Sequence, residues 1–134
     1  QSVLKDTGRV FRVLYTNSYD NGTTWEKPLP LGIDGSPAHL MRHSSGAIIC
    51  TYGYRELDFL KEKNTGSGQR AIISYDDGKT WTKPYIISDH IDTYDIGYPS
   101  TVELFDGSLY TVYYQRESRE HHPGLLYSKW DLPE

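Results

Sequence analysis

Cysteine is scarce in this sequence, and long hydrophobic runs and an excess of positive charge are absent from it. Its single cysteine, Cys50, excludes an internal disulfide framework and a cysteine-based zinc site. We expect Cys50 to be a core residue. No apolar run approaches the roughly 18 residues that a membrane-spanning helix requires. Lys and Arg number 14 against 18 Asp and Glu, and the net charge of −4 argues against a general nucleic-acid binder.

The residues that are present suit a folded, tyrosine-rich protein. Hydrophobic residues make up 37% of the 134 positions, which is enough to form a core. Tyrosine accounts for 12 residues, whereas tryptophan and phenylalanine contribute 3 each. The length fits one ordinary domain or part of a larger one. Residues 1–5 do not resemble a signal peptide and are typical of the interior of a longer protein.

An eight-residue element occurs twice in the chain. Residues 18–25 read Ser-Tyr-Asp-Asn-Gly-Thr-Thr-Trp, and residues 74–81 read Ser-Tyr-Asp-Asp-Gly-Lys-Thr-Trp. Each copy is followed, one residue later, by Lys-Pro. A looser pair relates residues 36–49 to residues 98–110, where an extended segment leads into a Ser-Gly or an Asp-Gly turn. Internal repetition of this kind indicates a fold built from repeated supersecondary units.

The segments between the repeated turns have the composition of β-strands. They alternate in polarity or are rich in β-branched and aromatic residues, and Gly-containing turns separate them. The predicted strands are residues 9–15, 37–42, 47–54, 70–74, 85–87, 101–105, 108–114 and 125–130. The one helical candidate, 57–63, is cut off by Gly66 and Gly68. Short strands in a repeat favour the antiparallel blades of a β-propeller over a sandwich.

Counting strands predicts an incomplete propeller of about two and a half four-stranded antiparallel blades. Blade remnants occupy residues 1–31, a full blade 36–88 and a final blade 97–132. Open sheet edges are normally covered in proteins. We therefore expect the remaining blades, or further copies of the chain, to be partners that close the ring.

The repeated element Ser-x-Asp-x-Gly-x-x-Trp resembles the Asp box of the sialidase (neuraminidase) superfamily. The resemblance implies an all-β fold, a partial six-bladed β-propeller in which residues 1–134 form the C-terminal segment of one domain. It also implies that Asp20 and Asp76 are structural residues of outer turns, not catalytic carboxylates. Trp25 and Trp81 are expected to be buried between sheets.

A second resemblance concerns the possible active site. Residues 69–74, Gln-Arg-Ala-Ile-Ile-Ser, precede an Asp box, and residues 97–104 begin the final blade with Gly-Tyr-Pro-Ser. In bacterial exo-sialidases an arginine and a tyrosine occupy similar positions. By this resemblance Arg70 is one arm of a carboxylate-binding arginine triad and Tyr98 is the nucleophile. A neutral phenol suits a substrate whose anomeric carbon bears a carboxylate, and sialidases are the tyrosine exception among glycosidases.

Two further residues are candidates for substrate binding. Arg55 ends a second strand, in residues 51–55, and can reach the same mouth of the propeller, and His39 can face a central tunnel. Each candidate has a structural alternative: Tyr98 can pack in a core, Arg70 can form an ion pair on the rim, and His39 can be a satisfied core histidine. His121 and its neighbour fit a solvated loop better than a metal site.

Together these features predict the C-terminal part of a glycoside hydrolase, an exo-α-sialidase that cleaves terminal sialic acids with retention of configuration. The alternatives are a propeller glycosidase or lyase acting on another sugar, and a non-catalytic glycan-binding propeller assembled from two-blade subunits. The substrate would be a sialylated or other acidic glycan. No cofactor and no metal are implied. A secreted or periplasmic location is expected, with the signal peptide upstream of residue 1.

Overall fold

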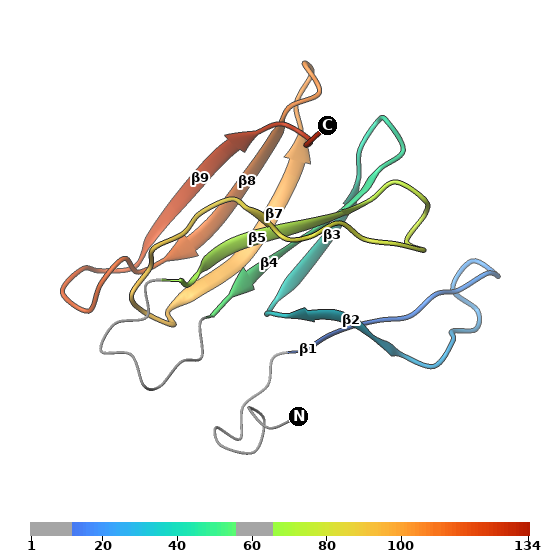
Figure 1. Ribbon diagram of the computed structural model, residues 1–134, viewed down its shortest axis with the longest axis horizontal. Coiled ribbons are helices and arrows are strands. Elements are labelled where there is room, and N and C mark those ends of the chain that lie inside the picture. Colours follow the sequence, from blue (N-terminus) through green and yellow to red (C-terminus); the bar gives the residue numbers. More distant parts are fainter. Residues whose placement is uncertain (1–11, 56–65) are drawn as a thin grey trace. The chain divides into compact units, whose positions relative to one another are not determined.

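The computed structural model describes residues 12–55 and 66–134, and the regular structure in these ranges is entirely β-strand (Figure 1). The prediction of an all-β fold is therefore confirmed. The chain divides into two compact units, Gln1–Ser36 and Pro37–Glu134. Nothing in the described residues forms a helix of the length and apolarity needed to cross a membrane.

The first unit contains one antiparallel hairpin. Strand β1 (Arg12–Tyr15) pairs with β2 (Leu29–Asp34), and the register shifts between Arg12 and Leu14. The loop between the two strands carries the first Asp box. The sequence predicts β1 within a longer strand, 9–15, of which residues 9–11 lie outside the described residues.

The second unit contains two antiparallel meanders. One is a four-stranded sheet in chain order, and the other has three strands, also in chain order. The strands are β3 (Ala38–Arg42), β4 (Ile48–Tyr54), β5 (Gly68–Ser74), β6 (Tyr85–Ile86), β7 (Ile96–Glu103), β8 (Leu109–Gln115) and β9 (Gly124–Trp130). Each of these strands overlaps an extended segment predicted above, and β3 is the first strand expected in the full blade. The helical candidate, 57–63, falls largely in 56–65, outside the described residues.

A compact apolar core joins the two sheets of the second unit. Ile49 and Ile73 are paired across β4 and β5, and they cluster with Leu109 of β8 and Trp130 of β9. The Trp130 ring also stacks on Tyr85 at a centroid distance of 5.2 Å. Apolar burial of this kind is the main driving force that holds one sheet against another.

Threonines extend this interface with a buried hydrogen-bond chain. Thr101 Oγ1 of β7 bonds Thr51 Oγ1 of β4 at 3.1 Å and Thr111 Oγ1 of β8 at 2.8 Å. The Trp130 indole N–H donates to Thr111 Oγ1 at 2.9 Å. Since buried hydroxyls cost free energy when unpaired, this chain fixes the register of one sheet against the other.

The two Asp boxes have the same internal geometry. In each, the carboxylate accepts the backbone N–H of the threonine four residues later at 2.8 Å, and the hydroxyl of that threonine donates to its second oxygen. These bonds lower the pKa of Asp20 and of Asp76 to about 2. Both carboxylates are thus committed to their own turns, which is the structural role the sequence predicts.

The expectation for the first Asp-box tryptophan is wrong for the described residues. Trp25 is 62% exposed, and its indole N–H donates to Gly22 O within the same turn. Trp81 is half-buried, and its indole nitrogen is buried without a hydrogen-bond partner. Burial of the indole requires a neighbouring sheet, whereas the turn geometry does not. For this reason the two boxes share their hydrogen bonds and differ in burial.

Candidate active site

Four residues singled out from the sequence lie at one end of the two sheets in the second unit. Arg55 follows the last residue of β4, and His39 and Arg70 lie near the starts of the antiparallel neighbours β3 and β5. Tyr98 is the third residue of β7. Arg55 bonds the chain at Tyr94 and Ile96, which places the start of β7 at this same end.

Tyr98 has the most unusual backbone conformation in this group. Its φ is +55°, a left-handed value that bulky residues rarely adopt. The β7–β8 register shifts between Gly97 and Ser100, so Tyr98 and Pro99 occupy a bulge. Proline cannot donate to a sheet ladder and is tolerated at such positions. The bulge turns the Tyr98 side chain outward, where it is 71% exposed.

The ring of Tyr98 is held by a neighbour on β8. Its centroid lies 6.2 Å from that of Tyr114, with the planes tilted by 50°. Tilted aromatic pairs of this separation are mutually attractive. The phenol therefore contacts Tyr114 on one side and is open to solvent on the other. The alternative, in which Tyr98 packs in a core, does not match this exposed position.

Arg55 lies beside Tyr98 and fixes the chain that leads to it. Its guanidinium donates to Tyr94 O at 3.0 Å and to Ile96 O. Burial lowers the pKa of Arg55, while electrostatic attraction to Tyr98 and Asp95 acts in the opposite direction. A partly buried cation is therefore held close to the exposed phenol of Tyr98.

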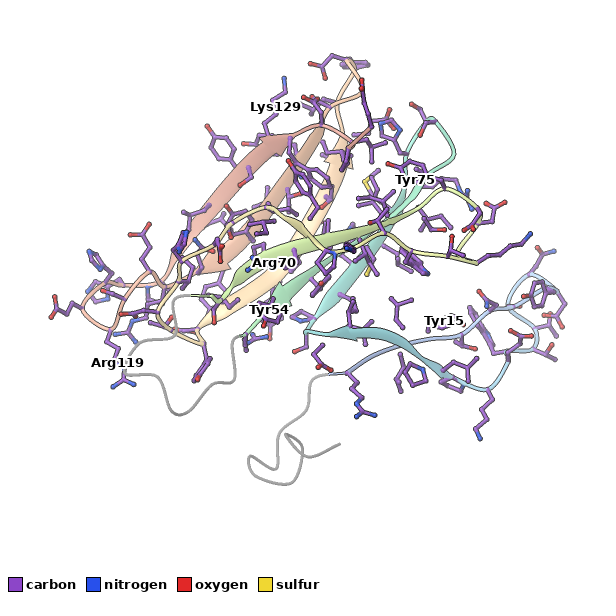
Figure 2. All side chains as sticks on the ribbon, in the orientation of Figure 1. Tyr15, Tyr54, Arg70, Tyr75, Arg119 and Lys129 are labelled. Atoms are coloured by element: carbon purple, nitrogen blue, oxygen red, sulfur yellow. The ribbon has the colours of Figure 1, made fainter. Side chains whose placement is uncertain are left out.

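The Arg70 side chain, which is labelled in Figure 2, is buried. The residue is 7% exposed, and its guanidinium lies 5.1 Å from the centre of the Tyr54 ring. One terminal nitrogen donates to Gln69 O and Ser88 O, and the other to Gly66 O and to the Asp89 carboxylate at 2.9 Å. This geometry joins the start of β5 to residues 88–89. It favours a supporting role for Arg70 over direct contact with a ligand carboxylate.

His39 joins the two sheets. It is half-buried, and its Nδ1 accepts the backbone N–H of Thr101 at 3.3 Å. It shares a face with Thr51, its partner across β3 and β4. His39 therefore has the environment of a satisfied interface histidine, at the same end of the sheets as Tyr98.

At the other end of the two sheets, a polar cluster that the sequence did not reveal joins the end of β7 to the turn between β3 and β4. Glu103 of β7 accepts the backbone N–H of Ser44 at 2.7 Å and also the Ser44 hydroxyl. It also lies 3.2 Å from His43 Nε2. These bonds lower the pKa of Glu103, with the Ser44 hydroxyl as the largest cause. Glu103 is occupied here, at the end of β7 opposite to that of Tyr98.

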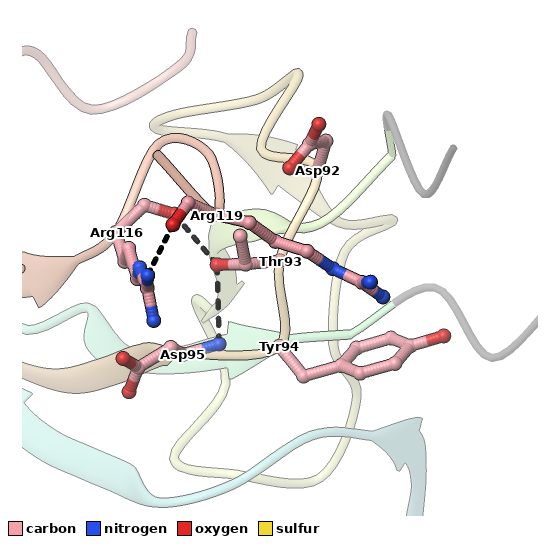
Figure 3. Close-up of a pocket in the computed structure, with 6 residues that line it drawn as sticks. All are labelled: Asp92, Thr93, Tyr94, Asp95, Arg116 and Arg119. Carbon is pink, nitrogen blue, oxygen red and sulfur yellow. Dashed lines mark hydrogen bonds between the residues drawn. The ribbon is translucent and has the colours of Figure 1, made fainter. Parts of the chain in front are cut away.

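A polar pocket lies beside residues 94–96, the segment to which the Arg55 guanidinium donates its hydrogen bonds. It has a volume of about 390 Å³ and is lined by Asp92, Thr93, Tyr94, Asp95, Arg116 and Arg119 (Figure 3). No sequence motif marks these residues, because they come from an irregular segment before β7 and from the turn after β8. The described part of the chain holds no group of three or more potential metal ligands. His121 bonds Ser118 within its own turn.

Comparison with known proteins yields a fold relationship. No family model matches the chain, and a comparison with curated proteins finds no match. The chain is similar to the crystal structure of a protein of unknown function from Dyadobacter fermentans, with a TM-score of 0.77 and 23% identity. The similarity covers 92% of this chain and 32% of that protein, so the chain spans about a third of its length.

Proposed function

We propose that this chain is the C-terminal part of a secreted or periplasmic exo-glycosidase with a sialidase-like propeller, acting on sialylated or other acidic glycans. The observation that carries the proposal is Tyr98, an exposed phenol in a left-handed backbone conformation beside the Arg55 guanidinium. Strained backbone of this kind costs of order 1–3 kcal/mol and clusters at functional sites.

The proposed reaction retains configuration in two displacements. In the first, Tyr98 Oη gives its proton to a base and bonds to the anomeric carbon, while the glycosidic bond breaks and the leaving oxygen takes a proton from an acid. In the second, water displaces the tyrosyl oxygen from the same carbon and restores the phenol. Arg55 supports the phenolate in both steps. The acid and the base would come from further blades.

The acidic group of the substrate would be held next to Tyr98. Arg55 interacts electrostatically with Tyr98, and its planar fork suits a carboxylate. Arg70 supports the site indirectly, because its hydrogen bonds hold residues 66–70 against residues 88–89. His39 supports it by fixing β3 to β7.

Further blades would also cover the open face of the β7–β8–β9 sheet. Leu125 and Tyr127 of β9 are 79% and 64% exposed, and the stacked rings of Tyr110 and Tyr127 lie on that face. Exposed apolar surface of this extent is typical of an interface. The match to a third of a longer protein is in keeping with a ring that is larger than this chain.

Turnover of a fluorogenic α-sialoside by the intact protein tests the proposal. The Tyr98→Phe variant should lose about a thousandfold or more in kcat, because it removes the attacking oxygen and little else. The control is Tyr127→Phe, which removes a hydroxyl from another exposed tyrosine. Glycan binding without turnover would favour the non-catalytic propeller, and turnover of a different acidic sugar would favour the other glycosidase or lyase. Activity of Tyr98→Phe at the wild-type rate would reject the mechanism.

A further inference from the structure

The two Asp boxes differ in the residue that precedes their glycine. The first box has Asn21 before Gly22, and the second has Asp77 before Gly78. Asparagine is a thermolabile residue, because the backbone nitrogen of the following residue can attack its side-chain amide. A following glycine leaves that nitrogen without a side chain to shield it. The Asn21–Gly22 pair therefore has the composition of a site where an asparagine loses its amide without the help of an enzyme.

The side chain of Asn21 is accessible in the structure. The residue is exposed, as is every residue from 19 to 30. The hydrogen bonds found in this box among the described residues leave the Asn21 amide unbonded. In the same loop, by contrast, Asn17 Nδ2 donates to the Glu26 carboxylate at 3.5 Å. The Asn21 amide is thus open both to the backbone nitrogen and to water.

A hydrogen bond to a serine restrains the attacking nitrogen. Gly22 N–H donates to Ser18 Oγ at 2.8 Å, and in the second box Gly78 N–H donates to Ser74 Oγ at the same distance. Ser74 is fully buried, whereas Ser18 is half-buried beside an exposed loop. Exposed loop hydrogen bonds open locally at low cost in free energy. The Gly22 nitrogen is therefore released more readily than the Gly78 nitrogen.

The second box shows that an aspartate is compatible with this turn. Asp77 has a φ of +58°, close to the +56° of Asn21, and Gly22 and Gly78 share a φ of +84°. Asparagine and aspartate are both among the residues that tolerate this left-handed conformation. Conversion of Asn21 to aspartate thus gives the first box the acidic residue that the second already has, and its hydrogen bonds are kept.

An isoaspartate at position 21 has the opposite effect. Its main chain runs through the side-chain carbons and is one carbon longer. Two bonds of the box span this position, from Gly22 N–H to Ser18 Oγ and from Thr24 N–H to the Asp20 carboxylate, each at 2.8 Å. The extra carbon moves both donors away from their acceptors. The bonds from Thr24 that lower the pKa of Asp20 to about 2 are then lost.

We propose that Asn21 is a site of spontaneous deamidation, and that its isoaspartyl product opens the first Asp box. The Gly22 nitrogen bonds to Asn21 Cγ, the Cγ–Nδ2 bond breaks, and the amide leaves as ammonia with the proton that the nitrogen gives up. Water then opens the succinimide ring. Attack at the side-chain carbonyl gives aspartate, and attack at the main-chain carbonyl gives isoaspartate. This chemistry is independent of any reaction at Tyr98.

The test is prolonged incubation of the intact protein at mildly alkaline pH, followed by peptide mapping with mass spectrometry. Asn21 should gain about 1 Da as its amide becomes a carboxyl group, and an isoaspartyl methyltransferase should label part of the product. Asn17, which is followed by serine, should convert more slowly. Ser18→Ala should speed conversion of Asn21 about twofold to tenfold, because the restraint on Gly22 N–H is removed. Thr23→Ala, in the same loop, is the control and should not.

Hydrogen exchange of the separated products tests the opening of the box. In the isoaspartyl form, the backbone amides of Gly22 and Thr24 should exchange about fivefold faster or more, since each loses a hydrogen bond. In Asn21→Asp they should exchange as in the unmodified protein. Three results would overturn the inference: conversion of Asn21 only after the protein is unfolded, equal conversion of Asn17 and Asn21, and unchanged exchange in the isoaspartyl form.

Discussion

Replacing Arg70 by lysine separates a supporting arginine from one that binds a ligand. Arg70 donates to Gln69 O, Ser88 O, Gly66 O and the Asp89 carboxylate. Lysine keeps the charge but presents one nitrogen in place of a planar fork, so it cannot reach acceptors on both sides. At least one carbonyl and part of the Asp89 interaction are then lost.

The expected cost follows from the burial of these groups. A buried acceptor left without its donor costs about 1–3 kcal/mol, and a charge-assisted bond contributes about 1.5–3 kcal/mol. The Asp89 side chain is 26% exposed, so water compensates part of the loss. We therefore expect Arg70→Lys to lower the free energy of unfolding by about 2–4 kcal/mol, a melting shift of roughly 10 °C.

Urea unfolding followed by circular dichroism measures this change, with Arg42→Lys as the matched control. Arg42 pairs with Asp77 on the surface, where both side chains are more than half exposed. That substitution should change stability by less than about 0.5 kcal/mol. If Arg70→Lys also stays within 0.5 kcal/mol while weakening binding of an acidic sugar, the supporting role is refuted and Arg70 belongs to the ligand site.

Three further predictions follow from particular contacts. Gly68→Ala should destabilise by about 2 kcal/mol or more in thermal unfolding, because its Cβ would lie 2.1 Å from Ser88 O; wild-type stability would mean that the backbone there yields freely. Tyr98→Asn should raise stability by about 0.5–1 kcal/mol in urea, since asparagine tolerates a left-handed φ, and an equal loss would show that the ring packing outweighs the strain. The depressed pKa values of Asp76 and Asp106, each about 2, mean that the folded state favours their ionised forms. Their contribution is present above pH 4 and lost as pH falls toward 2, so melting temperature should fall across that range, less steeply in Asp76→Asn; an identical slope in that variant would contradict the assignment.

The strands and turns were predictable because their signals are local. Glycine at the turn positions and alternating β-branched residues determine a hairpin within a few residues, and the Asp-box aspartates bond within four positions of themselves. The position of Tyr98 at the start of a strand was also read correctly. Its left-handed φ was not, since it arises from the bulge between β7 and β8.

Interactions between residues far apart in the chain could not be predicted from the sequence. The Glu103–Ser44 bonds join residues 59 positions apart, and Arg70 of β5 pairs with Asp89, 19 positions later, in a loop without a motif. The pocket residues 92–95 and 116–119 also come together only through the β7–β8 pairing. Tryptophan burial at the first Asp box failed as a prediction because it depends on a neighbouring sheet, which the turn itself does not specify.

The self-contained hydrogen bonds of the Asp boxes have a consequence for the order of folding. Each turn closes a loop of a few residues, for which the entropy cost is small, and closure of such loops is fast. The bonds from Glu103 to Ser44 require a much longer loop to close. We expect the Asp-box hairpins to form early, and the threonine chain and the Glu103 cluster to form as the sheets meet. Mutations at Thr80 should then slow folding, whereas mutations at Ser44 should mainly speed unfolding.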